Sequence, residues 1–225
     1  MTWIKICGTT NLRDAQLSVA AGADALGFIF APSPRAIDVN TAGEIIRGLR
    51  VKVEVIGVFV NQAPCAIAEV AQKLDLCGVQ LHGDEPAEML PEFRRTLGSR
   101  KIIKTLHIHE MFHNSGELTK YLSAFECTDA VLLDSGSRGQ RGGTGTTYDW
   151  GAALPIVEKI GAAMPLIIAG GLCSDNVARA IERFGPWGVD VVSGVESSPG
   201  MKDESKVQAF IAAVRHAAIS VQQKV

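Results

Sequence analysis

The sequence predicts a single (β/α)8 barrel in which residues 1–225 form one catalytic domain. Eight short apolar segments recur along the chain, and continuous hydrophobic runs are typical of parallel strands that are covered on both faces. Segments with one apolar stripe at helical spacing lie between them. Eight such units in 225 residues fit a closed barrel, for which about 250 residues is typical. An open doubly wound sheet is the alternative, but it usually has a glycine-rich fingerprint after its first strand, and none is present here.

The predicted strands are rich in Val, Ile and Leu. They cover Trp3–Cys7, Ala25–Phe30, Val53–Val60, Gly78–Leu81, Ile102–Leu106, Ala130–Asp134, Leu166–Ala169 and Val189–Ser193. The predicted helices place apolar residues at positions i, i+3, i+4 and i+7. The clearest stripes run through Ala42–Leu49, Ile67–Leu74, Val177–Phe184 and Val207–Val214.

Residues that favour helix starts precede several of these stripes. Asn11 and Ser174 are predicted to be N-caps, because their side chains can accept a hydrogen bond from a first-turn amide. Pro64 and Pro86 are predicted to lie in first helical turns, where a missing N–H group costs nothing.

The overall composition favours a globular protein of a reducing compartment. The formal net charge is −2 and Lys and Arg are scattered, so no nucleic-acid partner is expected. Five irregularly spaced cysteines argue against a disulfide framework. No apolar run approaches the roughly 18 residues of a membrane helix, and a predicted strand at Trp3 leaves no room for a signal peptide. We therefore expect a cytoplasmic protein with no membrane partner.

Two reactive residues end predicted strands, where barrel enzymes place their catalytic groups. Cys7 ends the first strand and Asp134 ends the sixth. Alternation along the first strand puts Lys5 and Cys7 on the inner face, and Ile4 and Ile6 on the helix side. A thiol can serve as a base if its pKa falls, and a carboxyl as an acid if its pKa rises. Alternatively, the cysteine is a small buried hydrophobe and the aspartate a loop or cap residue.

Two glycine-rich turns follow the predicted strands seven and eight. Gly170 and Gly171 form the first turn, and Ser193 and Gly194 form the second. Barrels often bind phosphate with these two loops, because glycine lets backbone N–H groups approach an anion. We therefore predict a phosphate site at these four residues, with ordinary turns as the alternative. Gly143, in the long loop after the sixth strand, could add donors or belong to a lid.

Further polar residues lie near the same end of the predicted barrel. Arg35 follows the second strand, where a guanidinium suits a substrate carboxylate; the alternative is a solvated loop arginine. His82 ends the fourth strand and is expected to bind substrate or to hold a neighbouring loop. His107 and His109 are expected to be polar loop residues. No His, Cys or Asp spacing resembles a metal-ligand set, so no metal site is expected.

Lys5 is expected to have a carboxylate partner inside the barrel. A buried lysine is costly unless it is paired. Asp190 lies on the eighth strand, which neighbours the first strand when the barrel closes. We therefore predict an ion pair between Lys5 and Asp190 or a nearby carboxylate.

Six short motifs occur in a fixed order over nearly the whole chain. They are Lys5–Gly8, Gly78–Glu85, Leu132–Ser135, Gly142–Gly145 with Asp149-Trp150, Ala169–Leu172, and Ser193–Glu196 with Pro199-Gly200. Each motif is weak alone, but the ordered set is specific, and the chain resembles the phosphoribosylanthranilate isomerase family. Two departures are a segment from Phe30 to Arg35 that is one residue shorter than in many members, and Thr146 where lysine is frequent.

The resemblance implies an isomerase of tryptophan biosynthesis. Its reaction is the Amadori rearrangement of N-(5-phosphoribosyl)anthranilate to 1-(2-carboxyphenylamino)-1-deoxyribulose 5-phosphate, without a cofactor. It implies that Cys7 is the general base, Asp134 the general acid and Arg35 the contact to the anthranilate carboxylate. The turns at Gly171 and Ser193–Gly194 would bind the phosphate. The expected partner is a small phosphorylated substrate, and the protein is expected to be a monomer or a homodimer.

Three other functions compete with this interpretation. The related histidine-pathway isomerase works with two aspartates, and Cys7 argues against it. Indole-glycerol-phosphate synthase uses a lysine as acid and has a longer N-terminal extension. The third alternative is a non-enzymatic barrel that binds phosphorylated ligands without converting them. The presence of both Cys7 and Asp134 argues against it.

Overall fold

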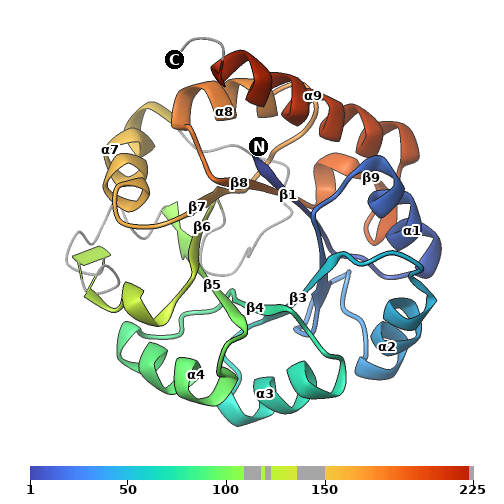
Figure 1. Ribbon diagram of the computed structural model, residues 1–225, viewed down its shortest axis with the longest axis vertical. Helices are drawn as coiled ribbons and strands as arrows, with labels where there is room; N and C mark the ends of the chain where they lie inside the picture. Colours follow the sequence, from blue (N-terminus) through green and yellow to red (C-terminus); the bar gives the residue numbers. More distant parts are fainter. Residues whose placement is uncertain (109–117, 120–122, 136–149, 223–225) are drawn as a thin grey trace.

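The computed structural model describes residues 1–108, 118–119, 123–135 and 150–222. Within these residues, eight parallel strands pair in sequence order and β1 also pairs with β8, so the sheet closes into a barrel (Figure 1). The strands are β1 (Trp3–Cys7), β2 (Ala25–Ile29), β3 (Glu54–Phe59), β4 (Gly78–Leu81), β5 (Lys101–His107), β6 (Ala130–Asp134), β7 (Leu166–Ile168) and β8 (Gly188–Val191). The predicted (β/α)8 barrel is confirmed, and every predicted strand overlaps an observed one.

Helices surround the strands on the outside of the barrel (Figure 1). The described helices are α1 (Leu12–Ala21), α2 (Val39–Gly48), α3 (Pro64–Lys73), α4 (Leu90–Leu97), α7 (Trp150–Gly161), α8 (Val177–Phe184) and α9 (Glu204–Gln222). After β8 the chain forms a short 3-10 helix, η3 (Ser193–Val195), and an antiparallel hairpin of β9 (Glu196–Ser198) and β10 (Met201–Lys202). Within the described residues, no helix combines the length and the apolar character needed to cross a bilayer.

Two of the predicted helix starts are confirmed. The side chain of Asn11 accepts a hydrogen bond from the amide of Asp14, at 2.9 Å, and caps α1. Pro64 is the first residue of α3, where its fixed φ suits the helix and its missing N–H group has no intrahelical partner to lose.

The other two helix starts differ from the prediction. Ser174 is not an N-cap, because α8 begins at Val177. The side chain of Asn176 instead accepts from the amide of Cys173 and donates to the carbonyl of Gly171, both at 2.9 Å, which holds a turn before the helix. Pro86 has an extended backbone and precedes the 3-10 helix η1 (Ala87–Met89), so that α4 begins only at Leu90.

The barrel wall separates two apolar layers. Ile4 and Ile6 point outward and are fully buried between the wall and the helices. A second cluster fills the barrel interior and consists of Trp3, Ala25, Ile56, Ile103, Ala130, Leu132, Ile167 and Ala169. This separation confirms the predicted alternation along β1, and it places Lys5 and Cys7 on the inner face with Trp3.

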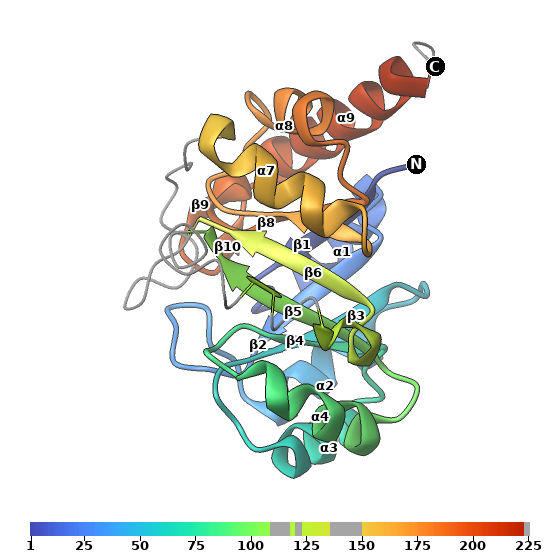
Figure 2. The same ribbon diagram turned by 90° about the vertical axis from the view of Figure 1, so that its left-hand side faces the viewer.

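The two ends of the barrel differ in character. At the N-terminal end of the strands, Trp3 stacks on Trp187 with ring centroids 5.1 Å apart, and the ammonium group of Lys101 lies 5.6 Å from the Trp3 ring. Lys101 also pairs with Glu54 at 2.8 Å. In Figure 2 the arrowheads of β5 and β6 point to the opposite side, where β9 and β10 lie. Packing and ion pairing therefore close one end and leave the C-terminal end for chemistry.

The helix layer is expected to supply much of the stability of the barrel. Phe93 in α4 is fully buried, so Phe93→Ala should lower the free energy of unfolding by about 3–5 kcal/mol through lost contacts and a residual cavity. Urea denaturation monitored by circular dichroism measures this loss. Glu92→Ala, at the exposed neighbouring position of the same helix, should change it by about 0.5 kcal/mol or less. Equal losses for both variants would contradict the packing argument.

Candidate active site

A pocket of about 670 Å3 opens at the C-terminal end of the strands, within the range of about 300–1,000 Å3 that is common for ligand sites. It brings together residues that lie far apart in the sequence. The predicted site residues that line it are Cys7, Arg35, His82, Asp134, Gly170, Gly171 and Ser193. Gly194 adjoins it as the neighbour of Ser193, whereas Gly143 lies outside the described residues. Among the described residues, no group of three or more His, Cys, Asp or Glu side chains is arranged to hold a metal ion.

Cys7 ends β1 and its side chain is almost fully buried. Gly27 is its register partner on β2, and a Cβ atom at Gly27 would lie 2.5 Å from Sγ of Cys7. Burial raises the pKa of the Cys7 thiol above its ordinary value; the charge of Lys5 opposes this shift and that of Asp190 adds to it. This direction is opposite to the lowered pKa that would make the Cys7 thiol a ready base.

The predicted ion pair of Lys5 is confirmed. Its Nζ lies 2.7 Å from Oδ1 of Asp190 and donates to Oε1 of Gln80 at 2.8 Å, and Lys5 has no exposed surface. Burial alone would lower the pKa of Lys5, but the negative charges of Asp190 and Cys7 outweigh burial and leave that pKa raised. A positively charged ammonium group is thus held beside the thiol.

Asp134 faces a histidine across the pocket. Oδ2 of Asp134 lies 3.5 Å from Nε2 of His82, and both residues line the pocket. The His82 ring meets the ring of His107 edge-on, with centroids 5.3 Å apart. His107 is buried and is the last residue of β5, paired in register with Asp134. The expectation that His107 is a polar loop residue is therefore wrong, because β5 extends one residue beyond Leu106; His109 lies outside the described residues.

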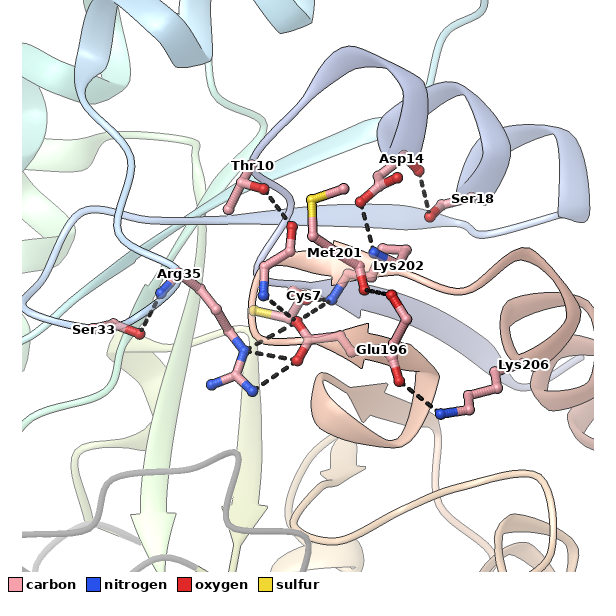
Figure 3. Close-up of polar contacts among 12 residues, drawn as sticks. Cys7, Thr10, Asp14, Ser18, Ser33, Arg35, Glu196, Met201, Lys202 and Lys206 are labelled. Atoms are coloured by element: carbon pink, nitrogen blue, oxygen red, sulfur yellow. Dashed lines mark hydrogen bonds and ion pairs between the residues drawn. The ribbon is translucent and has the colours of Figure 1, made fainter.

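Arg35 reaches the pocket, but a carboxylate of this chain already holds most of its guanidinium (Figure 3). Nε and Nη2 donate to Glu196 at 2.7–3.0 Å, while Nη1 makes no hydrogen bond to a described residue. Glu196 also accepts from Nζ of Lys202 at 3.0 Å and from the amide of Gly200 at 3.2 Å. Lys202 in turn donates to the carbonyl of Cys7 at 2.6 Å. One carboxylate therefore links the arginine to the strand that carries the thiol.

The buried charges of Arg35, Glu196 and Lys202 hold the β9–β10 hairpin in position. Burial works against ionisation of Glu196, yet hydrogen bonds from Arg35 and the charge of Lys202 keep the pKa of Glu196 below its usual value. Burial lowers the pKa of Lys202 despite the carboxylate beside it. The backbone amide of Lys202 donates to Asp14 of α1 at 2.6 Å. No role for Glu196 or Lys202 was predicted from the sequence, although both are charged residues within or next to a recognised motif.

The two glycine turns lie side by side at one end of the pocket. Gly170 and Gly171 have φ values of +84° and +65°, which glycine adopts without strain. A Cβ atom at Gly194 would overlap the carbonyl group of Leu172, so the second turn packs directly against the first. The backbone N–H groups of Gly171, Ser193 and Gly194 donate to no other described residue. Unpaired amides in two adjoining turns are suited to binding an anion.

The family model and the similar sequences point to the same protein family. The family model described as N-(5'phosphoribosyl)anthranilate (PRA) isomerase matches residues 4–213. The N-(5'-phosphoribosyl)anthranilate isomerase of Pseudomonas aeruginosa is 41% identical over 213 residues, which cover 94% of each chain. This agreement extends over almost the entire barrel.

Solved structures of similar sequence share the architecture. A phosphoribosyl anthranilate isomerase in complex with reduced 1-(o-carboxyphenylamino)-1-deoxyribulose 5-phosphate is 36% identical, with a TM-score of 0.78, over 96% of this chain and 100% of that chain. The same values hold for monomers generated from the dimeric isomerase of Thermotoga maritima. The sequence matches and the shared barrel thus show that this chain belongs to the N-(5'-phosphoribosyl)anthranilate isomerase family, whose members are isomerases of tryptophan biosynthesis.

Proposed function

We propose that this chain converts N-(5-phosphoribosyl)anthranilate into 1-(2-carboxyphenylamino)-1-deoxyribulose 5-phosphate by an Amadori rearrangement under general acid–base catalysis. The observation that carries the proposal is the presence of Cys7 and Asp134 in one pocket, at the ends of β1 and β6. A base and an acid from separate strands can act on different atoms of one substrate.

The rearrangement requires two proton transfers that these residues can perform. Asp134 donates a proton to the furanose ring oxygen, the bond from C1 to that oxygen breaks, and the nitrogen lone pair forms a protonated Schiff base. Cys7, as the thiolate, then removes the proton from C2, and the electrons of that bond form the C1–C2 double bond of an enolamine. Loss of the O2 proton and protonation of C1 give the ketone. Only protons move between groups, so the reaction uses no redox cofactor.

Two anchors hold the substrate in this proposal. Nη1 of Arg35 is directed to the anthranilate carboxylate, because Glu196 occupies the other guanidinium nitrogens. The turns at Gly170–Gly171 and Ser193–Gly194 hold the phosphate through the amides of Gly171, Ser193 and Gly194, which donate to no other described residue. His82 contacts Asp134 and lines the same pocket. Gly143, outside the described residues, remains a proposed contact.

The remaining features of the proposal concern the whole chain. We infer one catalytic domain over residues 1–225 that acts on a small phosphorylated molecule, with no nucleic-acid partner, as a monomer or a homodimer. A dimeric form of the related Thermotoga maritima isomerase supports the second possibility. The five cysteines are free, which agrees with a reducing compartment such as the cytoplasm.

Loss of either proposed catalytic group should remove most of the activity. Cys7→Ala and Asp134→Asn should each lower kcat by at least about 100-fold, because each removes one general acid–base contribution. The decay of substrate fluorescence measures turnover. Cys65→Ala removes an exposed thiol in α3 and should leave kcat unchanged. An inert wild-type protein would refute the reaction, whereas an active Cys7→Ala variant would refute only the role of the thiol.

The raised pKa of Cys7 predicts that activity increases as the pH rises. The base must be the thiolate, and a thiol whose pKa is raised ionises only as the pH rises. The kcat/KM of the wild type should therefore increase by up to about tenfold per pH unit between pH 7 and 9. In Cys7→Asp, the ordinary carboxyl pKa of about 3.9 lies far below this range and the charge of Lys5 opposes the effect of burial, so the carboxylate should stay ionised and the increase should disappear. A wild-type profile that is flat from pH 7 to 9 would contradict a thiolate base.

The glycine turns should control recognition of the phosphate. A Cβ atom at Gly194 overlaps the carbonyl of Leu172, so Gly194→Ala must push the two turns apart. We expect KM and the inhibition constant of inorganic phosphate to rise by about 10–100-fold, the equivalent of one or two charge-assisted hydrogen bonds. Gly161→Ala is the matched control, because a Cβ atom there has no neighbour within 4 Å. Unchanged inhibition by phosphate in Gly194→Ala would place the anion elsewhere.

A further inference from the structure

A buried series of polar contacts crosses the barrel interior from the base of the pocket to Asp134; the Lys5–Gln80 and Gln80–His82 links are hydrogen bonds, and the last link is a charge contact. Nζ of Lys5 donates to Oε1 of Gln80 at 2.8 Å. Nε2 of Gln80 lies 2.9 Å from Nδ1 of His82, and Nε2 of His82 lies 3.5 Å from Oδ2 of Asp134. Gln80 is 1% exposed and Lys5 is 0% exposed. Water therefore has little access to the first links of this series.

Lys5 determines which way the amide of Gln80 faces. An ammonium group has three donors and no acceptor, so the Gln80 atom 2.8 Å from Nζ must be the amide oxygen. The reverse orientation would place N–H groups against a buried positive charge. Asp190 holds Lys5 in place from β8, at 2.7 Å. The NH2 group of Gln80 is consequently turned toward His82.

The orientation of this amide determines the tautomer of His82. The atom 2.9 Å from Nδ1 is a donor, so Nδ1 presents its lone pair and the proton of the neutral ring resides on Nε2. Thr105 fits the same assignment, with its Oγ1 at 3.3 Å from Nε2 of Gln80 and 3.1 Å from Nδ1 of His82. The hydroxyl can accept from the amide and donate to the ring. A proton on Nδ1 would instead face the N–H group of Gln80.

We propose that Gln80 is a positioning residue that keeps His82 in the Nε2–H tautomer, so that His82 presents a donor to Oδ2 of Asp134. With Oδ2 as the acceptor, the acid proton of Asp134 resides on Oδ1, and the carboxylate left after proton donation keeps a hydrogen bond. This role rests on the proposed function of Asp134 as the general acid. Gln80 itself acts through His82.

Nitrogen-15 NMR of protein labelled at histidine tests the tautomer directly, independently of turnover. The His82 signals are identified by their loss in His82→Asn. We expect the wild type to show a protonated Nε2 and an unprotonated Nδ1. Gln80→Glu is isosteric, and its carboxylate accepts hydrogen bonds from both Lys5 and the ring, so the proton should move to Nδ1. A protonated Nδ1 in the wild type would overturn the proposal.

Kinetics of the same variants test the consequence for catalysis. Gln80→Glu should lower kcat by about 10-fold or more while KM changes by less than about 3-fold, because general acid catalysis is impaired and the anchors are intact. Gln72→Glu makes the same chemical change on the exposed face of α3 and should alter neither the spectrum nor kcat. Unchanged kcat in a variant with the inverted tautomer would overturn the proposal, as would lost activity with the original tautomer.

A second variant covers the case in which Gln80→Glu fails to fold. Gln80→Met keeps the length of the side chain but removes both the acceptor for Lys5 and the donor for His82. We expect its His82 signals to shift toward an average of the two tautomers and its kcat to fall. Wild-type spectrum and wild-type kcat in Gln80→Met would refute the role of Gln80. If the wild type is inert on the proposed substrate, the reaction fails, whereas the tautomer assignment is still decided by the spectrum.

Discussion

Lys5 and Asp190 meet at the seam where β1 pairs with β8, so closure of the barrel and the electrostatics of the pocket share one buried contact. Either charge alone would be left without water and without a partner of opposite charge, which typically costs about 3–5 kcal/mol. The ion pair therefore fixes the register in which β1 pairs with β8. It also sets a fixed ammonium group beside Cys7 and, through Gln80, reaches His82 on the other side of the interior.

A second buried network organises the rim of the pocket. Glu196 accepts from Arg35 and Lys202 at the same time, and these three residues together carry one net positive charge. In a site with limited access to water, such an excess attracts anionic groups. Because Lys202 also binds the carbonyl of Cys7, the hairpin that follows β8 fixes the position of Arg35 relative to Cys7.

The sequence was sufficient to predict the features that depend on local pattern or on a general rule of the fold. Alternation placed Cys7 inward, strand ends located Asp134, and closure of the barrel paired Lys5 with Asp190. Contacts that depend on how loops fold could not be predicted in this way. Glu196 and Arg35 are 161 positions apart, and nothing in their spacing indicates that they meet. Ser174 was misassigned because Asn176, two residues later, makes the competing turn.

The absence of a side chain at Gly27 has an evolutionary consequence. The thiol of Cys7 occupies the space that a Cβ atom at position 27 would need, so position 27 cannot be enlarged while position 7 keeps its thiol. A lineage that enlarged residue 27 would first have to move or shrink residue 7, and with it the group proposed to take the substrate proton. Selection for the thiol at the end of β1 therefore also restricts a position on β2, a strand that contributes no reactive group of its own. A larger residue at position 27 is expected only where residue 7 has also changed.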